Sequence, residues 1–76
     1  MTIGDCAWLP LNVNGKTYKK SFCQIVNIIK HPYLNISIVR VKSSYNHNEI
    51  ISCVPDELEM ITNEGEAMKL VLEYLI

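Results

Sequence analysis

The hydrophobic pattern of the chain is densest between Ser21 and Lys42, where two short segments are rich in β-branched residues. The apolar residues of these segments are Ile25, Val26, Ile28, Ile29, Leu34, Ile36, Ile38, Val39 and Val41. Side chains of this kind fit a pleated, half-buried surface. We therefore predict two strands joined at a corner made by Lys30, His31 and Pro32, with the rest of the chain closing a small barrel on them.

The second segment alternates apolar and polar residues as far as Ile38, after which the phase reverses. A reversal inside one strand is typical of a β-bulge or a sharp coil, which a small barrel needs in order to close. The first segment shows a weaker reversal between Ile25 and Val26. The pattern thus favours a bulge in the second segment. A buried helix over residues 23–29 is the alternative, and Asn27 and Pro32 make it too short to prefer.

Shorter predicted elements flank this pair. They are a first strand (6–9) that Pro10 ends or limits to an edge, a turn at Asn14 and Gly15, a polar loop (43–48), a fourth strand (49–54), one helical turn (55–58) and a short closing strand (59–61). The predicted fold class is therefore mainly β. It is a five-stranded SH3-like small barrel over residues 3–61 with one C-terminal helix over 63–76, and the whole chain 1–76 is a single domain.

The helix prediction begins with Asn63, an N-cap residue followed three positions later by Glu66. Residues 67–76 are expected to be helical, with one narrow polar stripe and apolar residues around most of the circumference. This is more apolar surface than one face of a small barrel covers. Two interpretations stay open: the helix closes the barrel as core, or part of it meets a partner. The predicted partner-binding residues are Met68, Leu72, Tyr74, Leu75 and Ile76.

Composition narrows the class of protein. A single domain of 76 residues buries only about 60% of its unfolded surface, so its stability is marginal unless disulfides, a metal or a partner add to it. The three cysteines are an odd number and no signal peptide precedes them, which argues against a secreted disulfide scaffold. No apolar run approaches the roughly 20 residues that span a bilayer. We expect a soluble cytoplasmic protein with no membrane partner.

The net charge of −1 conceals a segregation, because there is no acidic residue from Cys6 to Asn48 and only one cation after Glu49. Such asymmetry marks a polyanion-binding face in some proteins, whereas in others the two halves fold together and neutralise. The candidate nucleic-acid-binding residues lie in loops 16–20, 30–33 and 40–45. They are Lys16, Lys19, Lys20, Lys30, Arg40, Lys42, Tyr18 and Tyr45. A pI near 6.0 is low for a dedicated nucleic-acid-binding domain.

Candidate chemistry is sparse. The possible metal ligands Cys6, Cys23, Cys53, His31 and His47 include no pair at the C-x2-C spacing of structural zinc sites. We therefore predict no metal and no cofactor, and buried thiols that act as small hydrophobes. A nucleophilic Cys needs a nearby His, and the pair Cys23 and His31 stays open on sequence alone. The chain contains no phosphate-cradling glycine loop, and its core is too small for a usual substrate pocket. We predict no enzyme activity and no small-molecule substrate.

The order of these elements resembles the SH3-like small barrels and, among them, the Tudor-type pattern. The resemblance covers residues 3–61 and is carried by Gly4-Asp5-Cys6-Ala7-Trp8, Asn14-Gly15-Lys16-Thr17-Tyr18, Cys23-Gln24-Ile25, Ile36-Ser37-Ile38-Val39-Arg40-Val41 and Ile51-Ser52-Cys53-Val54. Tudor-type domains cage a methylated cation with several aromatics. Trp8 and Tyr18 fall at matching positions and Tyr45 lies near a third, fewer than such a cage uses, so the prediction does not include methyl-ligand binding.

The function predicted from the sequence is a non-enzymatic protein-interaction module. It would act as a small free-standing regulator, inhibitor or assembly subunit that binds a protein partner or a second copy through the apolar helix. The alternative is a small barrel that binds nucleic acid through the basic loops.

Overall fold

The computed structural model describes residues 1–13, 15–44 and 49–75, with the backbone alone described at 11–13 and 17–19. Its elements are β1 (Cys6–Val13), β2 (Lys16–Lys30), β3 (Ser37–Ser43), β4 (Glu49–Cys53), the 3-10 turn η2 (Pro55–Glu57), β5 (Glu59–Met60) and α1 (Glu64–Tyr74). The predicted fold class of five strands followed by one C-terminal helix is confirmed at this level.

The five strands form one antiparallel sheet in the order β4-β3-β2-β1-β5. β4 and β5 are the two edges of this sheet, and in the described part of the chain they do not pair with each other. The sheet is therefore open, and its closure into a barrel stays a prediction.

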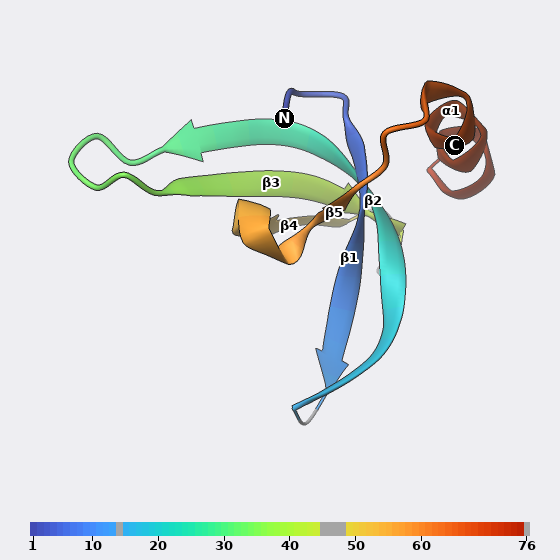
Figure 1. The fold of residues 1–76 in the computed structure, drawn as a ribbon, viewed down its shortest axis with the longest axis horizontal. Helices are drawn as coiled ribbons and strands as arrows, with labels where there is room; N and C mark the ends of the chain where they lie inside the picture. The colour runs from blue at the N-terminus through green and yellow to red at the C-terminus, as the bar shows by residue number, and fades with distance from the viewer. Residues whose placement is uncertain (14, 45–48, 76) are drawn as a thin grey trace.

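β2 is the central strand and belongs to two hairpins. It has 15 residues, and its first half pairs with β1 while its second half pairs with β3. The pairing register shifts between Ile25 and Asn27, which is where the strand bends. Figure 1 shows the result as two arms, one formed by β1 and β2 and the other by β2 and β3.

The predicted bulge in the second apolar segment is wrong. β3 begins only at Ser37, so Leu34 and Ile36 precede the strand, and no register shift occurs within its pairing to β4. The bulge lies instead opposite β3, in β2, where the sequence showed the weaker reversal. The alternation of apolar and polar residues before Ile38 therefore belongs mostly to the connecting loop and not to a strand.

Of the two alternatives for Pro10, that it ends the first strand or limits it to an edge, the first is wrong, because β1 continues to Val13. β5 pairs with β1 only at Ala7 and Trp8, so β1 has a single neighbouring strand from Leu9 onward. A proline that lacks an N–H donor is tolerated at such a local edge. The predicted turn that follows is consistent with Gly15, whose φ of +79° favours glycine, whereas Asn14 and the polar loop residues 45–48 lie outside the described residues.

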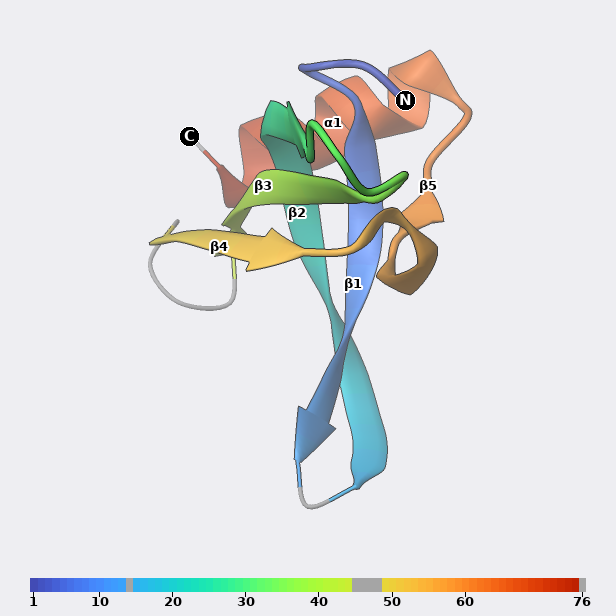
Figure 2. The same cartoon turned by 90° about the vertical axis from the view of Figure 1, so that its left-hand side faces the viewer.

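The chain packs as three layers around two apolar clusters. β3, β4 and η2 lie on one side of the β1–β2 hairpin and α1 lies on the other, as Figures 1 and 2 both show. The first cluster fills the space between the sheet halves and contains Ala7, Leu9, Cys23, Ile25, Val39, Val41, Cys53 and Leu58. The second cluster lies beneath the helix and contains Cys6, Phe22 and Leu75.

The helix spans Glu64–Tyr74 and begins directly after Asn63, in agreement with the predicted helix over 63–76. Asn63 caps it as predicted, because its side-chain Oδ1 accepts a hydrogen bond of 2.9 Å from the Glu66 backbone N–H. No helix in the described ranges is long and apolar enough to cross a membrane.

Candidate functional site

The helix uses one side to cover the outer face of the β1–β2 hairpin. Ala67, Leu70 and Val71 pack on the cluster around Phe22, which is 1% exposed. The Trp8 ring meets Phe22 edge-on with centroids 5.7 Å apart, so Trp8 belongs to this cluster rather than to an open aromatic cage. Part of the helix is thus core, as one of the two open interpretations stated.

The other flank of the helix remains uncovered. Met68 is 65% exposed and Leu72 is 60% exposed, and their spacing of four residues places them side by side along the helix. Tyr74 is about half exposed and its ring also contacts Phe22, with centroids 6.0 Å apart. Leu75 is buried against the sheet, and Ile76 lies outside the described residues. Of the predicted partner-binding residues, the structure therefore leaves Met68, Leu72 and Tyr74 accessible.

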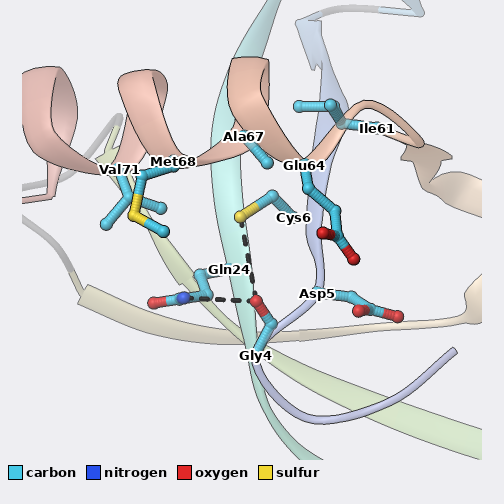
Figure 3. Close-up of a pocket in the computed structure, with 9 residues that line it drawn as sticks. All are labelled: Gly4, Asp5, Cys6, Gln24, Ile61, Glu64, Ala67, Met68 and Val71. Carbon is cyan, nitrogen blue, oxygen red and sulfur yellow. Dashed lines mark hydrogen bonds between the residues drawn. The ribbon is translucent and has the colours of Figure 1, made fainter.

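A groove of about 320 Å³ adjoins this flank. Its helix wall is formed by Glu64, Ala67, Met68 and Val71, and its opposite wall and floor by Gly4, Asp5, Cys6, Gln24 and Ile61. Figure 3 shows Met68 and Val71 at the end of the groove near Gln24, and the side chains of Asp5 and Glu64 at the other end. The groove therefore has apolar walls and a carboxylate-bearing end.

The lead-in segment that forms the second wall is held by the sheet. Gly4 N–H donates to the Ile25 carbonyl and Ile25 N–H donates to the Asp5 carbonyl, both at 2.8 Å. The Gly4 carbonyl in turn accepts from Gln24 Nε2 at 3.2 Å and from the Cys6 thiol at 3.8 Å. Gly4 has φ +97°, a conformation that other residues rarely adopt. These hydrogen bonds hold the wall against β2.

The three thiols are buried, and burial disfavours their ionised form. Burial raises the pKa of Cys6, and the nearby Asp5 carboxylate raises it further. Burial is also the main cause of the raised pKa of Cys23 and of Cys53. A thiol nucleophile acts as the thiolate, which a raised pKa disfavours. The neutral form is therefore favoured in all three thiols.

The structure does not bring the residues of the open catalytic pair together. Cys23 is fully buried in the first cluster, and its thiol contacts Ser21. His31 lies in the exposed β2–β3 loop, where its ring contacts Tyr33. Within residues 1–13, 15–44 and 49–75, no group of three or more His, Cys, Asp and Glu side chains is placed to hold a metal ion.

The candidate nucleic-acid-binding residues divide between the two arms. Lys16 and Lys20 belong to the β1–β2 arm, and Lys20 is paired there with Glu59. Lys30, Arg40 and Lys42 belong to the β2–β3 arm. Tyr18 and Lys19 are described by backbone alone in β2, and Tyr45 lies outside the described residues. The cations thus form two separate groups rather than one continuous basic surface.

Sequence reasoning missed the groove because its walls are distant in the chain. Asp5, Gln24 and Glu64 come from the lead-in, from β2 and from the first turn of α1, and only tertiary packing brings them together. The acidic first turn of the helix was recognised as a capping feature alone. The sequence signal that could have indicated the opposite wall is the Gly4-Asp5 dipeptide, since glycine and aspartate favour a turn.

Comparison of the chain with protein-family models, with curated proteins and with solved structures finds no match. The resemblance to SH3-like and Tudor-type domains therefore remains a prediction, and function is inferred from the surfaces of this chain.

Proposed function

We propose that this chain is a non-enzymatic protein-interaction module that binds a partner protein, or a second copy of itself, through the exposed flank of α1 and the adjoining groove. The observation that supports the proposal most directly is the exposure of Met68 and Leu72 beside a groove with apolar walls. Large apolar side chains that remain exposed next to a concave surface are typical of interaction sites.

The charge at the end of the groove defines the partner further. Asp5 and Glu64 contribute carboxylates at one end, while Ala67 and Val71 supply apolar walls. A protein segment that presents a Lys or Arg next to an aliphatic or aromatic side chain complements this arrangement, because the stem packs on the walls and the cation meets the carboxylates. We propose such a basic and apolar segment as the ligand of the groove.

In this proposal the sheet is the scaffold of the module and corresponds to an open SH3-like barrel. The strand order, in which β5 returns to pair with β1, supports that assignment. The role as a small regulator, inhibitor or assembly subunit in the cytoplasm is part of the same proposal.

The decisive experiment uses substitutions within the intact helix. Truncation after Thr62 is unsuitable, since it would uncover Phe22 and Cys6 and could not separate lost binding from lost folding. Light scattering over a range of concentrations should show self-association of the wild type that Leu72→Asp abolishes. Lys69→Asp is the matched control, because it introduces the same side chain as Leu72→Asp. Lys69 is exposed on α1 and does not line the groove.

If the wild type is a monomer throughout, a photo-crosslinking residue tests a foreign partner. The photo-crosslinking residue at position 72 should then capture one defined protein, and the same photo-crosslinking residue at position 69 should not capture it. Equal capture at the two positions, together with a monomeric wild type, would refute the proposal. Circular dichroism of each variant separates lost binding from lost folding.

A further inference from the structure

The connection between β2 and β3 contains a second group of exposed apolar side chains, distant from the helix. Tyr33 is 92% exposed, and the other members of the group are about half exposed. They are Ile29, Leu34, Ile36 and Ile38. Figure 1 shows this hairpin projecting away from the rest of the molecule, with its loop beyond η2. Ile29 and Ile38 are directly paired, so their side chains lie on the same face of the sheet.

The first part of the loop, residues 31–34, has its backbone donors paired within the loop. His31 N–H donates to the Ile36 carbonyl at 3.0 Å. The N–H groups of Tyr33 and Leu34 both donate to His31 Nδ1, at 3.1 and 3.0 Å. Pro32 has no N–H. Residues 31–34 therefore present no unpaired backbone donor, which lowers the cost of placing them where water is scarce.

The charged side chains behind this loop are cations. Arg40 pairs with Asn27 and Lys42 pairs with Gln24, and these residues share the outer face with Ile29 and Ile38 because they alternate with the buried Val39 and Val41. Lys30 stands at the end of β2. No Asp or Glu occurs between Asp5 and Glu49 in the sequence. The acidic turn η2 packs on the inner side, through the first apolar cluster, and ends short of the loop.

The spacing of the apolar and cationic groups fits the boundary of a lipid bilayer. Ile38 lies two residues from Arg40 along β3, which is about 7 Å at roughly 3.3 Å per residue. Interfacial protein segments bury their apolar side chains about 5–10 Å into the boundary between headgroups and acyl chains. With the loop at that depth, Arg40 would lie near the level of the lipid phosphates and Lys42 about 7 Å further out. Tyrosine is itself favoured at this boundary.

We propose that the β2–β3 hairpin is a peripheral membrane-binding site, whose apolar loop enters the interface of an anionic bilayer while the cations of its outer face contact lipid phosphates. This site goes beyond the helix-mediated function and uses none of its residues. The expectation of no membrane partner rested on the lack of a spanning segment, and peripheral insertion needs none.

Sedimentation with vesicles tests the proposal on the full chain. The wild type should bind vesicles of phosphatidylcholine and phosphatidylserine and bind pure phosphatidylcholine much less. Replacing Tyr33 and Leu34 together by Ser should lower the partition coefficient about tenfold or more. Arg40→Gln should lower it about fivefold, which is the effect of one cation at an anionic surface. Lys16→Gln, on the tip of the other arm, is the matched control and should change nothing.

Three results would overturn the proposal. They are the absence of wild-type binding to either vesicle, equal binding to both vesicles, and unchanged binding of the Tyr33 and Leu34 double variant. Absence of wild-type binding to both vesicles would indicate that a groove on another protein, and not a bilayer, receives the loop. Leu72→Asp separates this site from the proposed function, since it should abolish protein association and leave vesicle binding intact.

His31 provides a second, independent test through its role in positioning the loop. His31→Ala leaves the N–H groups of Tyr33 and Leu34 without an acceptor and should weaken vesicle binding. His31→Asn should restore it, because an Asn side chain accepts the same backbone donors in a turn. A Tyr33→Trp variant should gain fluorescence quenching by brominated lipids relative to the wild type. Equal vesicle binding by the two His31 variants, or no gain in quenching, would contradict insertion of the loop.

Discussion

The two halves of β2 both direct apolar side chains outward, but one half is covered by the helix and the other is not. In the first half Phe22 faces outward and is buried by α1. In the second half Ile29 faces outward as well, yet it remains about half exposed because no described element covers it. The register shift after Ile25 keeps both residues on one face although they are seven positions apart. One strand thus supplies core at one end and a contact surface at the other.

This difference shows that an apolar residue in a strand is not core by its type alone. The helix is long enough to cover only one half of the sheet, and it covers Cys6, Phe22 and Trp8. What remains apolar on the uncovered half requires another explanation, such as a bilayer or a partner. The following predictions test the comparison, beginning with the largest expected effect.

Removing the outward side chain from each half should give very different losses of stability. Phe22→Ala should lower the free energy of unfolding by about 3–5 kcal/mol, because it empties the cluster beneath the helix. Ile29→Ala should cost about 1 kcal/mol or less, since its side chain is largely solvated. Urea denaturation measures both. Similar losses for the two variants would mean that the helix does not distinguish the halves.

The pH dependence of stability should reflect the buried thiols. Burial raises the pKa of Cys6, Cys23 and Cys53 above the ordinary 9.0. Above that pH the unfolded chain releases thiol protons that the folded chain retains, so the unfolded state is favoured. Stability should therefore be fully present below about pH 9 and fall as the pH rises further. Urea midpoints at increasing pH measure this fall, and Cys23→Ala should reduce its slope.

Loss of the helix cap should weaken the covered half alone. Asn63→Ala removes the acceptor of the Glu66 N–H and should cost about 1 kcal/mol. Asn63→Ser retains an acceptor and should stay within a few tenths of a kcal/mol of the wild type. Hydrogen exchange should quicken in α1 and leave the amides of the β2–β3 hairpin unchanged. Faster exchange in the hairpin would show that the helix also stabilises the uncovered half.

The smallest effect is expected from the ion pair between Lys20 and Glu59, which joins β2 to β5 across β1. Both side chains are about half exposed, so their coupling free energy should be below about 1 kcal/mol. A double-mutant cycle of Lys20→Ala and Glu59→Ala measures it at low and high salt. A coupling that is large and independent of salt would indicate that the pair is more buried than its exposure implies.

Much of the fold was determined locally and could be predicted from the sequence. The β-branched density around Ile25 and Val41 specified strands, and Asn63 followed by Glu66 specified a capped helix start. The turn at Pro55 and the short strand that follows it were also predicted and are present. These signals act within a few residues, where backbone sterics and nearby hydrogen bonds decide the outcome.

The position of the bulge could not be predicted in the same way. The stronger phase reversal lay around Ile38, but the observed shift is at Ile25 and Asn27. A reversal in one strand looks the same as a loop that passes into a strand, and Leu34 and Ile36 are in such a loop. Only the pairing partner decides between the two, since register is a property of two strands.

The sequence by itself therefore determined the elements, their order and the surplus of apolar residues in this chain. The tertiary structure decided which of those residues are core. It buried Leu75, at the end of the helix, together with Phe22 of β2 in one cluster. It left Met68 and Leu72 exposed beside a groove, and it left Tyr33 exposed at the tip of an uncovered hairpin. The physical reason is that burial depends on which surfaces meet, and an 11-residue helix can cover only one arm of a sheet that bends into two.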